Sequence, residues 1–141
     1  MATHKYGSDN YASLGEKIED KFISLLINNG YKIRKATKEE NIKSHNDLYI
    51  SGYGCDVKDR KSTAIFVEYE LGGRDGWIKS QTTTYISFHL SDLDQFYICK
   101  REDILKLFEE KKYRICGRKQ YDEKLFVLPL ADLKAITRKI M

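Results

Sequence analysis

Two carboxylates and a lysine lie close together in a segment, His45 to Arg60, that otherwise has the composition of two β-strands. Asp47 opens the first expected strand, and Asp56 and Lys58 lie in the second. Because side chains alternate along a strand, Asp56 and Lys58 point to one face. Asp47 reaches the same side if a hairpin brings the strand ends together. This pattern indicates a chemical site inside a sheet-forming segment.

The chemistry that these residue types favour is hydrolysis of a phosphate ester with the help of a metal ion. Two carboxylates held close together repel, and a bound cation removes the conflict. Mg²⁺ takes one or two carboxylates, several waters and the phosphate oxygens of a substrate, and the Val57 carbonyl is a further oxygen donor. Lys58 would hold the attacking water or stabilise charge in the transition state. The alternative is an exposed strand face whose charges pair with one another.

A helix upstream carries a fourth candidate group. A capping box at Ser13–Glu16 predicts its start, and Asn29-Gly30 predicts its end. Its apolar residues form one stripe at about 100° per residue; they are Leu14, Ile18, Phe22, Ile23, Leu25 and Leu26. Glu19 falls inside this stripe. Because an unpaired buried carboxylate costs several kcal/mol, Glu19 either joins the metal site or lies at the stripe's edge and reaches water.

The remaining pattern predicts an α/β or α+β domain with a mixed sheet flanked by helices. Expected strands cover 31–35, 47–50, 55–58, 64–71, 83–88, 94–100 and 125–128, with helices at 101–112 and 130–140. We expect a polar loop at 37–46 and a short helical turn at Trp77. The short links after 50 and after 60 predict that the strands at 47–50, 55–58 and 64–71 are antiparallel neighbours.

Composition favours one domain, residues 13–141, after a flexible segment, 1–12. No apolar run approaches the ~20 residues of a membrane helix, and the polar N-terminus does not resemble a secretion signal, so we expect a cytoplasmic protein that is not in a membrane. Three cysteines without a Cys-x-x-Cys pair do not predict a disulfide framework or a zinc site. The net charge of +4 permits a polyanionic partner.

Together these segments resemble the PD-(D/E)XK nuclease superfamily. Asp47 matches its first aspartate, with Asn46 in place of a loosely kept proline, and Asp56-Val57-Lys58 matches its acid-x-Lys triplet, with Asp for the commoner Glu. The helix from Leu14 is similar to the opening helix of archaeal Holliday junction resolvases, in which a glutamate at the position of Glu19 joins the metal site.

The resemblance continues to Phe88. The segments Phe66–Leu71, Gly76-Trp77 and Tyr85–Phe88 are similar to a pattern of small phage-type nucleases, in which a strand with Glu, a Gly-Trp pair and an aromatic strand follow one another. Thr83-Thr84 departs from the Ala-Asp that often precedes the aromatic strand. This departure bears more on substrate contacts than on the metal.

The resemblance implies a restriction endonuclease-like core and a DNA endonuclease that uses Mg²⁺, with Mn²⁺ as a substitute, and leaves 5′-phosphates. It implies that Asp47, Asp56, the Val57 carbonyl and Glu19 hold the metal, while Lys58 serves the nucleophile. Glu68 is a candidate outer-shell group. The candidate DNA contacts are Arg60, Lys61, Lys79, Gln81 and Thr82.

Three questions stay open at this point. A nucleic-acid- or partner-binding module on the same fold, with a weakened or absent catalytic site, is the main alternative. Cleavage of RNA in place of DNA is another. A homodimer is a hypothesis that follows from the need for two sites to cut both strands of a duplex.

Overall fold

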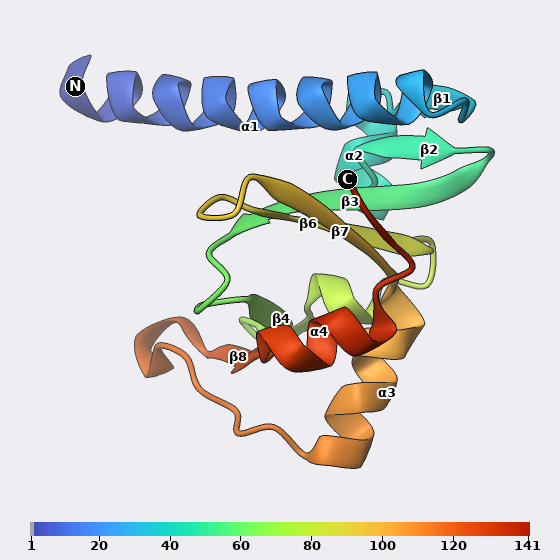
Figure 1. Ribbon diagram of the computed structural model, residues 1–141. Coiled ribbons are helices and arrows are strands. Elements are labelled where there is room, and N and C mark those ends of the chain that lie inside the picture. The colour runs from blue at the N-terminus through green and yellow to red at the C-terminus, as the bar shows by residue number, and fades with distance from the viewer. Residues whose placement is uncertain (1) are drawn as a thin grey trace.

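A mixed sheet lies in the middle of the molecule, with one long helix on one face and two shorter helices and a small sheet on the other (Figure 1). The computed structural model describes residues 2–141, with side chains described from residue 14 onward. The mixed α and β content expected from the sequence is confirmed. No helix among the described residues is long and apolar enough to cross a membrane.

The central sheet has six strands in the order β1-β2-β3-β6-β7-β9, and a second sheet has the order β5-β4-β8. In chain order the elements are α1 (Ala2–Asn28), β1 (Ile33–Lys35), α2 (Lys38–Ser44), β2 (Leu48–Ile50), β3 (Tyr53–Arg60), β4 (Phe66–Leu71), β5 (Arg74–Asp75), η1 (Trp77–Lys79), β6 (Tyr85–Leu90), β7 (Gln95–Lys100), α3 (Arg101–Lys111), η2 (Lys119–Tyr121), β8 (Glu123–Val127), α4 (Leu130–Ile136) and β9 (Lys139–Ile140). Within the central sheet β3 and β6 run parallel, and the other neighbours are antiparallel.

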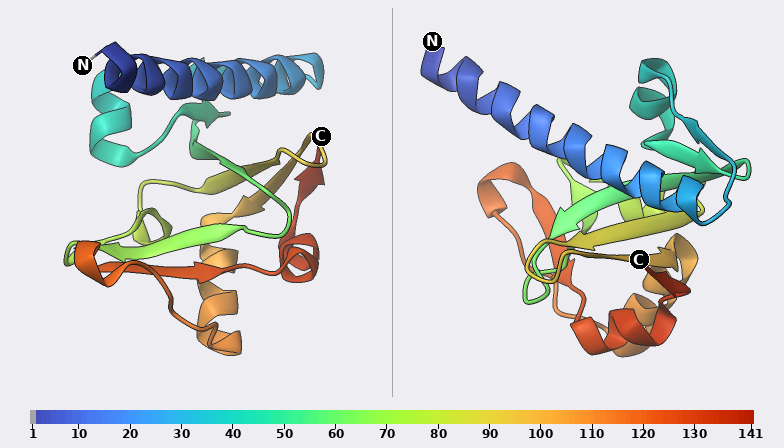
Figure 2. Two further views of the ribbon diagram at one scale, coloured as in Figure 1. Left: turned by 90° about the vertical axis from the view of Figure 1, so that its left-hand side faces the viewer. Right: turned by 45° about the horizontal axis from the view of Figure 1, so that its top comes forward.

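The parallel pair requires a crossover, because parallel neighbours cannot be joined by a tight turn. The chain leaves the central sheet after β3, forms β4, β5 and η1 on the opposite face from α1, and returns as β6 (Figure 2). The predicted hairpin of β2 and β3 is confirmed. The predicted pairing of β3 with β4 is wrong: β3 already has β2 and β6 on its two edges, and β4 pairs with β8 instead.

The two faces of the central sheet bury separate apolar clusters. Phe22 and Leu26 of α1 pack against Cys55 and Phe96 on the upper face, with Val57 partly buried beside them. The lower face packs against β4, β8, α3 and α4. Since side chains alternate along β3, Asp56 and Lys58 face the lower side, where the Lys58 Nζ lies 5.0 Å from the centre of the Trp77 ring.

Several predicted boundaries are wrong. Helix α1 begins at Ala2, well before the start expected at Ser13, and Leu14 of the predicted apolar stripe is 51% exposed. The expected loop 37–46 contains α2, whose capping box joins Thr37 and Glu40. The last helix ends at Ile136 and is followed by β9. The flexible segment expected at 1–12 stays a prediction, because its side chains lie outside the described residues.

Asn46 fixes the start of β2. Its side chain is buried; the amide Nδ2 donates to the Thr82 carbonyl at 3.1 Å, and its Oδ1 accepts from the Thr83 hydroxyl at 2.8 Å. A proline at this position would make neither bond. Gly54, on the neighbouring strand, leaves the space that the Asn46 side chain occupies. Asp47 is therefore positioned by a polar contact between β2 and the loop before β6.

We predict that Gly54→Ala destabilises the protein through Asn46. A Cβ atom at position 54 would lie 2.4 Å from the Asn46 Nδ2, so the side chain must move and lose its partners. We expect the free energy of unfolding in urea to fall by roughly 1–3 kcal/mol. The control is Gly15→Ala, where a Cβ meets no atom within 4 Å and the helix should gain about 1 kcal/mol. Equal stability of Gly54→Ala and the wild type would contradict this role of Asn46.

Candidate active site

The residues that the sequence singles out for chemistry line one pocket of about 270 Å³. Glu19 comes from α1, Asp47 from the start of β2, and Asp56, Val57 and Lys58 from β3. They are brought together from three segments of the chain. The sequence therefore predicted this grouping correctly, while the chemical roles of the residues stay a prediction.

The pocket lies where β3 extends beyond the end of its neighbour β2. Strand β2 begins at Leu48, opposite Cys55, and the Asp47 N–H donates to the Cys55 carbonyl at 2.9 Å. The next group on this edge of β3, the Val57 N–H, donates to the Asp47 Oδ2 at 2.8 Å. Because the N–H and C=O of one residue face the same edge of a strand, the Val57 carbonyl also faces this open edge. The Val57 carbonyl therefore offers a third oxygen ligand at the edge of β3 where the Asp47 carboxylate lies.

Asp47 is held by both of its carboxylate oxygens. Its Oδ2 accepts from the backbone of Val57, and its Oδ1 accepts from the Asn41 Nδ2 at 2.9 Å. Each carboxylate oxygen has a second acceptor position, so these bonds orient the group without using up its capacity for a cation. Asn41 also donates to the Asn46 carbonyl at 3.0 Å, which ties α2 to the start of β2.

Asp56 is buried beside two charges of opposite sign. Only 4% of the residue is exposed, and its Oδ2 lies 3.2 Å from the Lys58 Nζ. Burial raises the pKa of Asp56 to about 7, with Lys58 acting in the opposite direction and Asp47 adding to the rise. The Asp56 carboxyl is therefore poised between its neutral and charged forms near neutral pH.

The pKa of Glu19 is raised in the same way as that of Asp56. Burial, followed by repulsion from Asp47, raises the pKa of Glu19 to about 7, although Lys35 acts to lower it. Two carboxyl groups with raised pKa values line one pocket, so the site lacks positive charge. A bound divalent cation would supply that charge, and the donors on offer are all oxygens, as Mg²⁺ prefers.

The protein donors fit a metal site that is completed by water. Residues 14–141 hold no group of three or more His, Cys, Asp or Glu side chains close enough together to form a metal cage. The available set is Asp47, Asp56 and the Val57 carbonyl, with Glu19 close by. Mg²⁺ commonly keeps several waters and binds through one or two carboxylates, so this set suits it.

Besides Gly15 and Ile18 of α1, three polar residues that the sequence did not single out line the pocket: Asn41, His45 and Asp59. Asn41 belongs to α2, which was expected to be loop. His45 ends α2 in a left-handed conformation, with φ of 63°. Asp59 bonds the His89 ring at 2.9 Å, which links β3 to β6. The capping-box pattern at Thr37 and Glu40 was the one sequence signal that would have located α2 and hence Asn41.

The other predicted site residues lie outside the pocket. Glu68 is on β4 near Arg60. Burial lowers the pKa of Arg60, and the nearby acids, Glu68 among them, offset only part of this shift. The Arg60 Nε donates to the Phe66 carbonyl at 3.1 Å, so its guanidinium braces the segment after β3. Lys61 is exposed.

The predicted DNA contacts of the loop after η1 are partly engaged within the protein. The Lys79 Nζ lies 3.3 Å from both Glu70 and Asp75 and 3.7 Å from the centre of the Tyr69 ring. Gln81 lines the same separate hollow as Lys79. The Thr82 hydroxyl donates to the Ser44 carbonyl at 3.2 Å, at the end of α2. Contact of these residues with DNA stays a prediction.

Comparison of the chain with protein-family models, with curated proteins and with solved structures found no match. The resemblance to the PD-(D/E)XK superfamily therefore depends on the motif residues alone, and membership stays a prediction.

We predict that Asp56→Asn stabilises the metal-free protein at neutral and alkaline pH. The pKa of Asp56 is 3.8 without perturbation and about 7 in the fold, so between these values the unfolded chain loses a proton that the folded chain keeps. Stability conferred by the raised pKa is present in acid and is lost as the pH rises through this window. We expect the variant's Tm to exceed that of the wild type by roughly 5 °C at about pH 8 and to match it near pH 4.

The measurement is thermal unfolding across this pH range in EDTA, with Asp75→Asn as a control at an exposed acid outside the pocket. A loss of stability in Asp56→Asn that is equal at all pH values would mean that Lys58 fully compensates an ionised Asp56.

Proposed function

We propose that this protein is a Mg²⁺-dependent DNA endonuclease of the PD-(D/E)XK type. The observation that carries the proposal is the convergence of Glu19, Asp47, Asp56 and Lys58 in one pocket at the open edge of β3. An Asp-x-Lys triplet alone is common by chance. An acid on the inward face of a distant helix, meeting the triplet and a second aspartate, is a much more specific combination.

The proposed metal ligands are Asp47, Asp56 and the Val57 carbonyl, with Glu19 binding directly or through water. When bound there, Mg²⁺ would supply charge neutralisation at the phosphate and make water a better nucleophile. Asn41 and the Val57 N–H keep the Asp47 carboxylate oriented, which reduces the reorganisation needed on binding.

Lys58 is the proposed partner of the attacking water. Its ammonium group is placed by Asp56 at 3.2 Å and by the Trp77 ring at 5.0 Å, and the side chain is 23% exposed. From this position it can donate to the water and stabilise the charge that develops on the phosphate oxygens. Attack on the phosphodiester, with departure of the 3′-oxygen, leaves a 5′-phosphate and a 3′-hydroxyl.

Basic residues beside the pocket support a polyanionic substrate. Lys35 and Lys38 line an adjoining hollow together with Glu19 and Asp47. Lysines at such positions contact phosphates without regard to base sequence. For a duplex substrate, cutting both strands would require two such sites, and in that case the proposal extends to a homodimer.

The second candidate is a nucleic-acid-binding module on this fold with a weakened site. The ion pair of Lys58 and Asp56 favours it, because the lysine already neutralises a carboxylate that a cation would otherwise bind. The two candidates differ in whether a divalent cation binds with measurable affinity and whether phosphodiesters are cut.

We predict that Lys58→Ala and Asp47→Ala lower cleavage by at least about 100-fold, because each removes a group that acts on the reacting phosphate. The assay is incubation with Mg²⁺ or Mn²⁺ and labelled linear, circular, branched and single-stranded DNA, with a matched RNA panel. The control is Lys134→Ala, an exposed lysine on α4 outside the pocket. Full activity of Lys58→Ala would refute the mechanism, and cleavage of RNA alone would change the substrate.

We predict that Mn²⁺ or Mg²⁺ stabilises the wild type against heat and that Asp56→Asn removes this effect. Binding to the folded state alone raises Tm with cation concentration. Since Asp56 and Glu19 must be deprotonated to bind, and the pKa of each is about 7, the increase should be largest above about pH 7 and fade toward pH 5. An unchanged Tm at millimolar Mn²⁺ would favour the binding module.

A further inference from the structure

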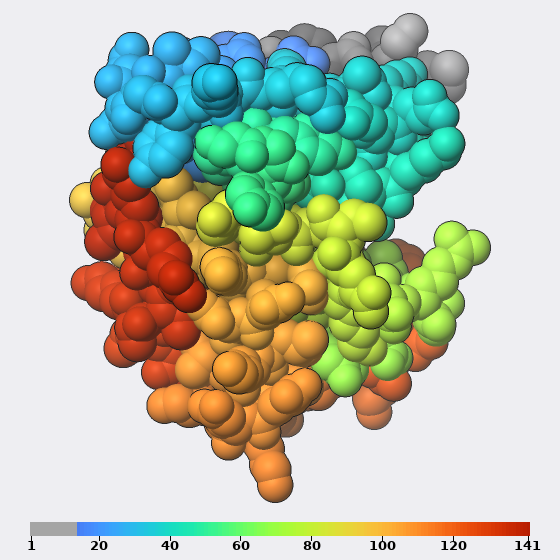
Figure 3. Space-filling model, turned by 90° about the vertical axis from the view of Figure 1, so that its right-hand side faces the viewer, coloured from blue at the N-terminus to red at the C-terminus, as the bar shows by residue number. Residues whose placement is uncertain are grey.

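A second pocket, also of about 270 Å³, lies at the other end of β3 and has a different chemistry. Its apolar lining comes from Leu26, Ile50 and Ile98, and three tyrosines complete its wall: Tyr31, Tyr53 and Tyr85. Among residues 14–141 no carboxylate lines it, whereas the candidate active site is lined by several. Figure 3 views the molecule from this end, where α1, the β2–β3 segment, β6 and the C-terminal segment meet.

Tyr53 and Tyr31 lie largely outside the core, whereas Tyr85 packs against the apolar cluster beneath α1. Tyr53 is 57% exposed and Tyr31 is 38% exposed, which leaves ring surface available to a ligand. Tyr53 meets Tyr85 edge to face, with ring centres 6.2 Å apart. Exposed aromatic faces around an apolar floor are suited to a flat ring, and the volume suits a fragment of one or two rings.

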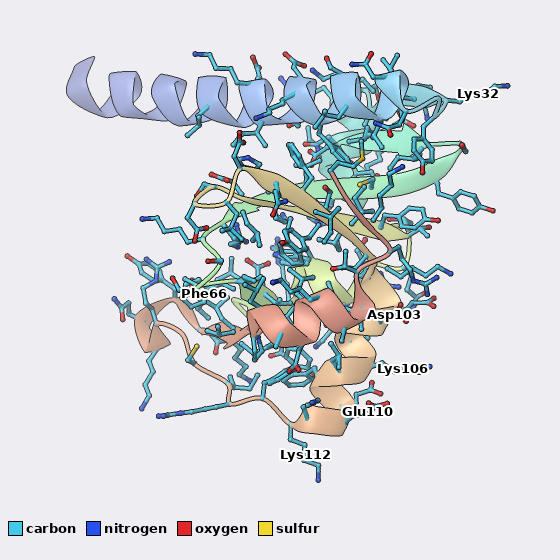
Figure 4. The ribbon with its side chains drawn as sticks, viewed as in Figure 1. Lys32, Phe66, Asp103, Lys106, Glu110 and Lys112 are labelled. Carbon is cyan, nitrogen blue, oxygen red and sulfur yellow. The ribbon has the colours of Figure 1, made fainter. Side chains whose placement is uncertain are left out.

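The basic side chains at this pocket indicate that its ligand carries a negative charge. The Lys139 Nζ lies 5.0 Å from the centre of the Tyr31 ring and 3.3 Å from its hydroxyl. Within residues 14–141 no carboxylate forms an ion pair with Lys139, while the neighbouring Arg138 pairs with Asp103 at 3.1 Å. Figure 4 labels Asp103 and also Lys32, which points outward from the loop between α1 and β1 on the same side. A ligand with an anionic group beside a flat ring matches this arrangement.

We propose that this pocket binds an unpaired nucleobase of a single-stranded nucleic acid, stacked on Tyr53, with its phosphate beside Lys139. Base stacking on aromatic side chains combined with a basic track is the usual means of binding single strands without sequence preference. A base paired within a duplex does not present its faces and does not enter the pocket.

The position of this pocket relates it to the candidate active site. Tyr53 and Asp56 lie three residues apart on β3, which is roughly 10 Å along the strand. The upper face of β3 between them is covered by α1, with Cys55 fully buried, and its edge is paired with β2, so a strand bound in both pockets passes around these elements and spans more than this distance. The inference deepens the proposed function by naming unpaired DNA as the substrate class. It rests on that function only for the statement that the bound strand is also cut.

The test is fluorescence anisotropy of a labelled oligo-dT of about eight nucleotides with the full chain in EDTA, where cleavage does not occur. We expect Tyr53→Ala to weaken binding about tenfold, because the stacking surface is lost, and Tyr53→Phe to bind as the wild type does. The matched control is Tyr121→Ala, since Tyr121 is 54% exposed with the Arg118 guanidinium 4.5 Å over its ring, yet lies outside the pocket.

Two further binding measurements identify the ligand. Lys139→Ala should weaken binding and reduce the slope of log K against log salt by about one. A duplex of the same length should bind equally to the wild type and to Tyr53→Ala.

Unchanged oligo-dT affinity in Tyr53→Ala would overturn the inference, as would an equal loss for the duplex. A nucleic-acid-free dimer that sedimentation detects in the wild type and not in Tyr53→Ala would also overturn it, by assigning the pocket to a second copy of the chain. Because binding is measured without a divalent cation, a protein that binds oligo-dT and cuts nothing would refute the proposed function alone.

Discussion

The burial of Asp56 beside Asp47 is the constraint on which the site depends. A carboxyl with 4% exposure costs free energy in its charged form, and the second aspartate adds to that cost. Lys58 offsets only part of it, since the pKa of Asp56 stays near 7. The structure keeps both acids together because Asp56 lies on a strand that is paired with β6, and the Asp47 carboxylate accepts a hydrogen bond from the Val57 N–H. Such local electrostatic strain is typical of sites that bind a cation or exchange a proton.

The topology of the sheet creates the open edge at which these groups meet. Strand β3 is eight residues long and β2 only three, so β3 continues beyond its partner from Asp56 onward. Groups from both faces of the sheet reach this edge, which explains how Glu19, on the α1 side, shares a pocket with Lys58, on the opposite side. The chain cannot cover the edge with a following hairpin, because after β3 it crosses to the lower layer and returns as β6 on the other side.

The sequence predicted the grouping of the pocket residues better than it predicted the pairing of the strands. The reason is that the grouping follows from patterns between residues close in sequence, whereas the pairing joins residues far apart. Alternation along a strand paired Asp56 with Lys58, and helical periodicity singled out Glu19; both patterns are local. The partner of β4 depends on β8, more than fifty residues later, so the short link after β3 was misleading. Helix α2 has no buried residue and hence no apolar period to detect. Lys79 was expected to be available to DNA; its pairing with Asp75 has i,i+4 spacing, but the contact with Glu70 depends on how the chain folds back after β4.

The same strand carries two pockets of opposite character, and this sets a geometric relation between them. Tyr53 begins β3 and Lys58 lies near its end, with the backbone between them paired to β6 at every residue from Cys55 onward. A strand held in this way does not change its length, so the spacing of the aromatic and acidic pockets is fixed by the rise of a β-strand. Helix α1 and strand β2 cover β3 between the two pockets, so a ligand that reaches both must pass around these elements.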